Sequence, residues 1–303
     1  MRQLSGTLLV ATLLCATGCS TWMKRGDSAV ADKSAPGEQI PTTAAQLVTY
    51  LNDCSGRLNS VTSSLEMDCK AKGESFGLEG AMVCEKPRNL RLRGSLIGQA
   101  ECDIGSNKDE FWYWIKHDNP PLLYHCSYDA MSQGNVRLPF PFQPDVVMAA
   151  LGMAEFNSDP NRYEVKVLPK TVELSEKSVS AQGQEVRKVT VFSRTKVELA
   201  DLRKGRPQVL EFKISDTRGQ DICKATVERV SVEGGVIVPR RIRVSWPASQ
   251  MELALTLKTV DVNSRPSPEA FDRTRLPYRS FDLARRAEDG QPTSIQRVRG
   301  SLR

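Results

Sequence analysis

Cysteine and histidine are the residues of this sequence with the most reactive side chains, and their spacing limits what they could do. The chain of 303 residues has eight cysteines and two histidines. His125 and Cys126 are adjacent, but neighbouring side chains of a strand point to opposite faces, so they do not form a nucleophile–base pair. The G-x-S-x-G, H-E-x-x-H and phosphate-loop motifs do not occur. We therefore expect no enzymatic activity, no metal and no cofactor.

Six of the cysteines lie in the part of the chain that is expected to fold. None of them forms the Cys-x-x-Cys motif that is typical of zinc sites. An even number of cysteines in an exported protein suggests disulfides, and we expect at least one; as free thiols they would be small core residues. The sequence does not determine the pairing. The candidates are Cys54, Cys69, Cys84, Cys102, Cys126 and Cys223.

The N-terminus has the pattern of an export signal. Arg2 is followed by the apolar run Leu8–Leu14, and small residues precede Cys19. A short apolar run of this kind is typical of a signal peptide that is removed. The segment Ala16-Thr17-Gly18-Cys19 resembles a bacterial lipobox, which implies that residues 1–18 are a lipoprotein signal peptide and that Cys19 is lipidated. The alternative is an ordinary secretory signal with a chance cysteine.

The lipobox resemblance also implies a location. Acyl chains contribute about 0.8 kcal/mol per buried CH₂ group, so several of them hold a protein firmly on a bilayer. By resemblance, Ser20 after the cysteine implies an outer membrane, with the protein facing the periplasm. The formal charge of +6 comes from Lys and Arg that are mixed with acids along the chain, whereas nucleic-acid binders cluster them. We expect a membrane partner and no nucleic acid; the oligomeric state is not determined.

The rest of the chain divides into a tether, a domain and a tail. Residues 19–41 have the composition of a flexible tether. Apolar residues from Leu47 to Val61 recur at helical spacing, which predicts a helix over 43–61 with Thr42 or Thr43 as N-cap. A second, short apolar helix is predicted over 146–153. Residues 279–303 are basic and polar, and we expect them to be disordered.

Most of the domain alternates between apolar and polar residues. Leu65, Met67 and Cys69, for example, share one face of a predicted strand, and turns separate many short runs of this kind. The pattern predicts about ten or eleven antiparallel strands. Open sheets of this size tend to curl. We therefore expect an α+β fold: a large curled antiparallel sheet, or half-open barrel, covered by one long N-terminal helix and a short second helix.

This arrangement resembles the periplasmic lipoprotein carriers and their outer-membrane receptors, the LolA/LolB-like proteins, over residues 42–278. The segments that carry the resemblance occur in the expected order: Lys86–Arg91, Lys108–Trp114, Val238–Ile242, and Val262-Asn263 with Phe271 and Pro277 after it. The resemblance implies a single LolA-like domain that binds acyl chains or lipoproteins. The chain is longer than the usual carrier and has an anchor motif that the soluble carrier lacks.

Two functions fit these features. In the first, a lipid-anchored protein binds acyl chains or lipoproteins in an apolar cavity between the helix and the sheet. In the second, a structural or protein-interaction lipoprotein fills the same space with its own side chains. Trp112 and Trp114 share one face of a strand and Phe111 and Tyr113 share the other, so one pair is core and the other packs or lines a ligand. We prefer the first function. Its candidate ligand-lining residues are Leu47, Tyr50, Leu51, Leu58, Leu90, Leu92, Phe111 and Tyr113.

Overall fold

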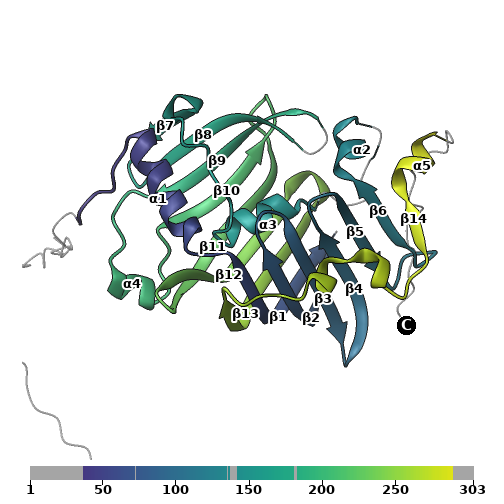
Figure 1. The fold of residues 1–303 in the computed structure, drawn as a ribbon. Helices are drawn as coiled ribbons and strands as arrows, with labels where there is room; N and C mark the ends of the chain where they lie inside the picture. The colour runs from purple at the N-terminus through teal and green to yellow at the C-terminus, as the bar shows by residue number, and fades with distance from the viewer. Residues whose placement is uncertain (1–36, 72, 135, 137–141, 181–182, 289–303) are drawn as a thin grey trace, which may run out of the picture. The chain divides into compact units, whose positions relative to one another are not determined.

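One curled sheet contains all the strands of the described chain. The computed structural model describes residues 37–71, 73–134, 136, 142–180 and 183–288 (Figure 1). Its 14 strands are arranged in the order β14-β6-β5-β4-β3-β2-β1-β13-β12-β11-β10-β9-β8-β7. Neighbours are antiparallel, except that β14 runs parallel to β6. The strands are β1 Ser60–Ala71, β2 Glu74–Glu85, β3 Asn89–Leu96, β4 Gln99–Ser106, β5 Glu110–Ile115, β6 Leu123–Ser127, β7 Tyr163–Val167, β8 Thr171–Val179, β9 Glu185–Ser193, β10 Val209–Ser215, β11 Asp221–Glu233, β12 Val236–Trp246, β13 Met251–Val262 and β14 Ser280–Asp282.

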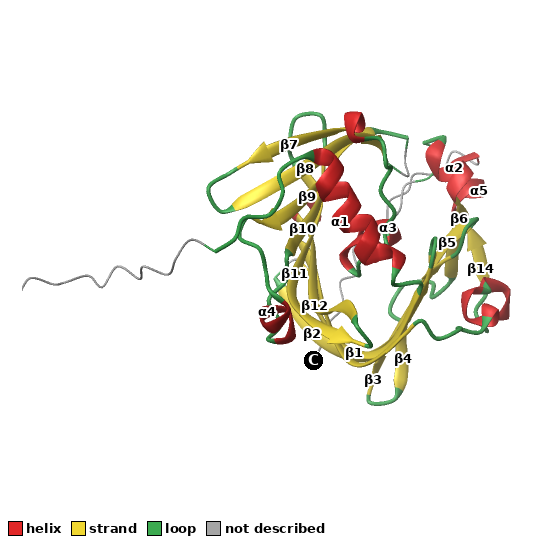
Figure 2. Ribbon diagram, turned by 60° about the vertical axis from the view of Figure 1, so that its left-hand side comes forward, coloured by secondary structure: helices red, strands yellow, loops and turns green. Residues whose placement is uncertain are grey.

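The sheet is not closed, and its two edge strands are β7 and β14. Figure 2 shows how it curls around α1 and α3. The α-helices are α1 Ala44–Gly56, α2 Tyr128–Ser132, α3 Pro144–Ala150, α4 Leu199–Arg203 and α5 Leu283–Glu288. Short 3-10 helices cover Pro160–Arg162, Pro247–Ser249, Pro268–Phe271 and Arg273–Arg275. Within the described chain, no helix has both the length and the apolar character needed to span a bilayer.

The first helix is shorter than predicted. α1 begins after Thr43, one of the two predicted N-caps, whose hydroxyl accepts a hydrogen bond from the backbone N–H of Gln46 at 3.4 Å. It ends at Gly56, although apolar residues continue at helical spacing to Val61. Val61 instead belongs to β1 and pairs with both neighbouring strands. Glycine is a poor helix residue and a β-branched residue favours a strand, so the sheet extends into the predicted end of the helix.

Other predicted boundaries also changed. The predicted second helix corresponds to α3. It begins at Pro144, two residues before the predicted start, because proline is well tolerated in the first turn of a helix, and it ends at Ala150, before the predicted end. The sheet has 14 strands where ten or eleven were predicted. The tail that we expected to be disordered from residue 279 begins with β14 and α5. The predicted signal peptide, Cys19, the predicted tether up to residue 36 and the tail after residue 288 lie outside the described residues.

The core lies mainly on the inner face of the sheet. One large cluster joins α3 to strands of the β1–β6 part of the sheet and to strands of the β9–β13 part. A smaller cluster lies under α1, where Leu47 and Leu51 pack against Val172 and Phe192. A third cluster lies apart from both of these: Trp112, Trp114 and Leu123 are buried there against the partly buried Leu276 and Tyr278.

A C-terminal strap, residues 264–282, provides the cover for this third cluster. The rings of Trp114 and Tyr278 are stacked, with their centroids 4.1 Å apart. The backbone N–H of Leu123 donates a hydrogen bond to the carbonyl of Arg279 at 2.9 Å, just before the strap continues as β14 beside β6. The strap therefore covers an edge strand that would otherwise expose unpaired backbone groups to other chains.

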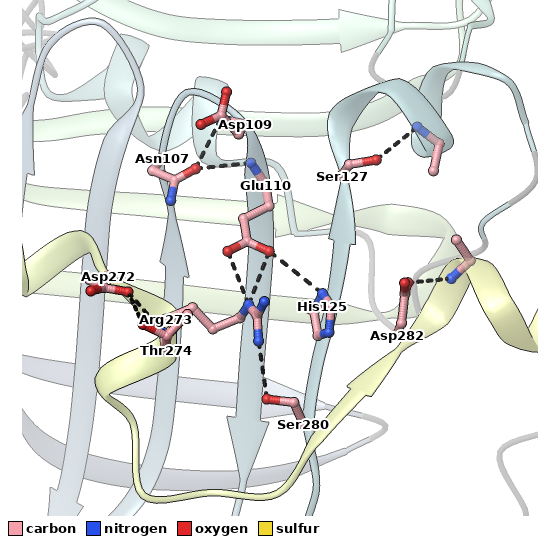
Figure 3. Close-up of polar contacts among 12 residues, drawn as sticks. Asn107, Asp109, Glu110, His125, Ser127, Asp272, Arg273, Thr274, Ser280 and Asp282 are labelled. Carbon is pink, nitrogen blue, oxygen red and sulfur yellow. Dashed lines mark hydrogen bonds and ion pairs between the residues drawn. The ribbon is translucent and has the colours of Figure 1, made fainter.

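Polar contacts fix the strap to β5 (Figure 3). The Nε atom of Arg273 donates to both carboxylate oxygens of Glu110 at 3.0 Å, and Nη1 donates to Ser280 Oγ at 3.1 Å. His125 Nδ1 lies 3.5 Å from the same carboxylate. Burial, assisted by the positive charge of Arg273, lowers the pKa of His125. At neutral pH the cation that pairs with Glu110 is therefore Arg273.

All six candidate cysteines are free thiols in the structure, so the expected disulfide is not found. In the strand register none of the five strand cysteines is directly opposite another. Cys84 pairs with Val61 and Leu90, for example, and Cys223 pairs with Ile214. Burial raises the pKa of Cys223 to about 12 and that of Cys69 to about 11. These thiols are therefore small core residues that stay protonated at neutral pH.

The strap contact can be tested by removing its cation. Arg273→Met should lower the free energy of unfolding by about 2 kcal/mol, because Glu110 is largely buried and would lose its partner. Arg275→Met is the matched control, since its ion pairs with Glu269 and Asp272 are exposed and such pairs contribute ~0–1 kcal/mol. Urea unfolding measures both variants. Equal losses would mean that the buried contact does not fix the strap.

The cysteine assignment can be tested by alkylation without a reductant. Iodoacetamide at pH 8 should modify buried Cys84, Cys126 and Cys223 slowly in the native protein, because burial raises the pKa of each thiol. After unfolding in denaturant, all six cysteines from Cys54 to Cys223 should react. Mass spectrometry counts the adducts. Two or more unreacted cysteines in the unfolded protein would indicate a disulfide and contradict the structure.

Candidate functional site

A cavity of about 370 Å³ lies between α3 with the segment that follows it and the inner face of β8, β9 and β10. Ligand pockets in proteins commonly measure about 300–1,000 Å³, so this one is near the small end of the range. Figure 2 shows α3 on the concave side of the sheet, facing these strands. The cavity is therefore part of the space that the curled sheet encloses and that the core does not fill.

The floor of the cavity consists of two rows of side chains across three strands. Leu174, Thr190 and Phe212 are opposite one another in β8, β9 and β10 and form the first row. The second row lies two residues further along each strand, on the same face of the sheet. It consists of Glu176, Lys188 and Ile214. The floor thus combines an apolar row, containing one hydroxyl, with a row that carries an acid and a base.

The roof of the cavity is apolar and begins on α3. Val146, Met148 and Ala149 of this helix line the cavity, while Val147 and Ala150 are buried in the main core with an exposed fraction of 1% each. Val146 and Met148 also belong to the main core, so the helix contributes side chains to both the cavity and the core.

The chain after α3 completes the roof and is held by α1. Met153 and Phe156 line the cavity. Asn52 of α1 donates a side-chain hydrogen bond to the carbonyl of Phe156 at 2.9 Å and accepts one from its N–H at 3.0 Å. These two bonds fix the backbone at Phe156 without filling the cavity. The N-terminal helix thus supports the wall of the cavity from behind.

Charged residues line one part of the cavity. Arg88 donates two hydrogen bonds to the carboxylate of Asp145, at 3.0 and 3.1 Å, and its guanidinium carbon lies 4.2 Å from the centre of the Tyr128 ring. Lys108 and Glu155 also line the cavity. The bidentate ion pair between Arg88 and Asp145 joins the β2–β3 turn to the start of α3, and so it links the roof of the cavity to the β1–β6 part of the sheet.

The lining has the composition of a binding site for an apolar ligand with a small polar part. Apolar side chains form most of the roof and half of the floor, and the polar groups of the floor are fixed by the strands. Within the described residues, no group of three or more His, Cys, Asp or Glu side chains is placed to hold a metal ion.

The structure places the eight predicted ligand-lining residues elsewhere. Leu47 and Leu51 are buried under α1, and Tyr50 is partly buried beside them. Five residues belong to the main core: Leu58, Leu90, Leu92, Phe111 and Tyr113. None of the eight is among the residues that line the cavity. The cavity predicted under the first helix and the cavity that the structure contains therefore lie over different parts of the inner face of the sheet.

A signal for the cavity was nevertheless present in the sequence. Glu176, Lys188 and Thr190 occupy inward-facing positions in their strands, where alternation would place apolar residues. Polar residues at such positions on two adjacent strands indicate a space that water or a ligand can reach. Identifying the roof residues Met153 and Phe156 required the path of the chain after α3, which periodicity does not give.

Comparisons with known proteins show which solved structures share the fold of this chain. No known protein family and no curated protein matches the sequence. A solved structure of a DUF1329 family protein from Desulfovibrio piger matches with a TM-score of 0.50 and 9% identity, over 76% of this chain and 96% of that one. This likeness shows a shared fold.

Two further solved structures are similar to this chain, and their names refer to the LolA superfamily and to lipoprotein sorting. A LolA superfamily protein from Nitrosomonas europaea matches with a TM-score of 0.49 and 11% identity, over 78% of this chain and 100% of its own. A putative outer membrane lipoprotein-sorting protein domain from Vibrio parahaemolyticus matches with a TM-score of 0.49 and 10% identity, over 76% of this chain and 96% of its own. The first of these two structures is named as a LolA superfamily protein, the group that the sequence resembles.

Proposed function

We propose that this protein is a lipid-anchored, non-catalytic protein of the bacterial envelope that binds an acyl chain in the cavity between α3 and β8–β10. The observation that carries the proposal is an apolar cavity of about 370 Å³ that the protein's own side chains leave open. Burying apolar surface contributes roughly 25 cal/mol per Å², so a chain of CH₂ groups that fills this space gains most of its affinity from burial.

The size and chemistry of the cavity favour one chain. Its volume is near the lower limit for ligand pockets, so a single-chain amphiphile fits better than the several chains of a lipoprotein. In the proposed complex the alkyl chain contacts Phe212 and Met153, while Lys188 and Glu176 offer hydrogen bonds to a head group. Lipidation of Cys19 and the outer membrane as location are further parts of the proposal, supported by the lipobox resemblance.

A second candidate function is that of a structural or interaction lipoprotein. One observation favours it: the space under α1, where the sequence predicted a cavity, is filled by side chains such as Leu47 and Phe192, with exposed fractions of 2% and 0%. The two functions differ in whether the remaining cavity takes up a ligand.

Two adjacent alanines of α3 provide a direct test of the cavity. Ala149→Trp should fill the cavity from its roof and weaken binding of a fluorescent fatty acid at least ~tenfold, because the ligand would lose apolar contacts worth more than ~1.4 kcal/mol. Ala150 is the matched control, because it faces the core with an exposed fraction of 1%. Ala150→Trp should overpack that core and lower the free energy of unfolding by about 1–3 kcal/mol.

The measurements are fluorescence titration and thermal melting on the wild type and both variants. The proposal expects Ala149→Trp to melt near the wild-type temperature while it loses the fatty acid. A wild-type protein that takes up no fatty acid would favour the structural function instead, and so would an Ala149→Trp variant that binds as tightly as the wild type.

The lipid anchor has its own test. Cys19→Ser removes the thiol that would carry the lipid, so the protein should remain an uncleaved precursor or appear in the soluble fraction of the envelope. Membrane fractionation of cells that express each form measures the outcome. Cys15→Ser is the control, since this cysteine lies within the predicted signal peptide. A Cys19→Ser protein that is cleaved normally and stays on membranes as firmly as the wild type would disprove the anchor.

A further inference from the structure

The described chain begins at one end of the β7–β10 part of the sheet. Ile40 donates a backbone hydrogen bond to Arg194 at 3.0 Å, and Lys196 donates one to Glu38 at 2.7 Å. Gln39 and Thr195 form an isolated bridge between these bonds. Whatever precedes residue 37 therefore joins the domain beside residues 194–196.

Two exposed elements adjoin this point. The turn between β7 and β8 is held to it by hydrogen bonds from Arg194 to the carbonyls of Lys170 and Leu168, at 3.0 and 3.1 Å. On the other side, α4 begins three residues after Lys196 and is anchored to the sheet through Leu202, which is 9% exposed. We call this surface the tether end and define it as residues 37–40, 166–170 and 194–206. Figure 2 shows α4 and the start of the described chain on the same side of the molecule.

The tether end combines positive charge with exposed aliphatic side chains. Six exposed cations lie on it: Lys166, Lys170, Lys196, Arg203, Lys204 and Arg206. Its acids are Glu38, Glu198 and Asp201, and they lie within 4.0 Å of Lys196 or Arg206. No acid in the described chain is within that distance of the other four cations. Val167 and Leu199, which are 46% and 52% exposed, lie among these cations.

We propose that the tether end is a membrane-contact surface that lies on an anionic phospholipid bilayer. Unpaired cations gain from the negative potential of such a surface, and exposed aliphatic side chains gain from entering its interface. The inference rests on the proposed lipid anchor for its setting, because the chain that follows Cys19 joins the domain at this end.

This orientation has a consequence for the domain. Strands in an antiparallel sheet connect alternately at its two ends, so the β8–β9 and β10–β11 turns lie at the end opposite the tether. These turns therefore point away from the bilayer. They carry Lys177 and Arg218 on or beside them, both exposed, which makes those residues a matched control for the cations of the tether end.

Vesicle binding of the unlipidated chain tests the proposal. The protein is produced from Ser20 onward, so that no acyl chain contributes, and is sedimented with vesicles of phosphatidylcholine alone or of equal parts phosphatidylcholine and phosphatidylglycerol. We expect binding to the anionic vesicles only, weakening as salt is raised. Arg203→Gln with Lys204→Gln should reduce it about tenfold or more. Adding Leu199→Ser to this double variant should reduce vesicle binding further. The control variant, Lys177→Gln with Arg218→Gln, should change vesicle binding by less than about twofold.

Other outcomes would overturn the proposal. Equal binding to both kinds of vesicle would do so, and so would equal effects of the two double variants. The β3–β4 turn also exposes a large aliphatic residue, Ile97, with an exposed fraction of 94%. If Ile97→Ser abolished binding while the Arg203/Lys204 variant bound normally, the contact would lie at that turn. Thermal melting checks that each variant folds. Failure of the anchor would appear separately, in the fractionation of Cys19→Ser.

Discussion

The pairing of β1 with β13 joins the two halves of the sheet, and the rest of the structure depends on it. β1 begins the meander that continues to β6, and β13 ends the one that starts at β7. The two strands pair over most of their length, and Ser64 and Thr259, which are hydrogen-bonded across this junction, are 195 positions apart in the chain. Without the junction there would be two smaller sheets, each with an additional open edge.

The continuous sheet creates a concave face that its helices only partly cover. α3 lies on this face with Val147 and Ala150 directed to the core, and its other side leaves the cavity above β8–β10. α1 fills the neighbouring space and holds the backbone at Phe156 through Asn52. Core and cavity are therefore neighbours on the concave face, and α3, a helix of seven residues, contributes side chains to both. This arrangement explains how a well-packed protein can retain space for a ligand.

Local patterns in the sequence were sufficient for the type of fold but not for the site. Alternation identified β1 and β2, and Thr43 marked the start of α1, because both depend on near neighbours in the chain. The end of α1 was missed because Leu58 and Val61 happen to continue the helical spacing, while sheet pairing places Val61 in β1. β14 was missed because three residues show no periodicity and the strand depends on a distant partner, β6. Polar residues at inward-facing positions of β8 and β9 marked the floor of the cavity, but its roof depends on the relation of α3 to three strands, which no local pattern encodes.

The central claim is that the cavity under α3 binds an acyl chain, and a crystal structure of the protein with dodecanoate tests it most directly. The account predicts a single alkyl chain between Met153 and Phe212, with its carboxylate near Lys188. Crystals in which this space holds only water, or in which the fatty acid binds elsewhere on the sheet, would contradict it.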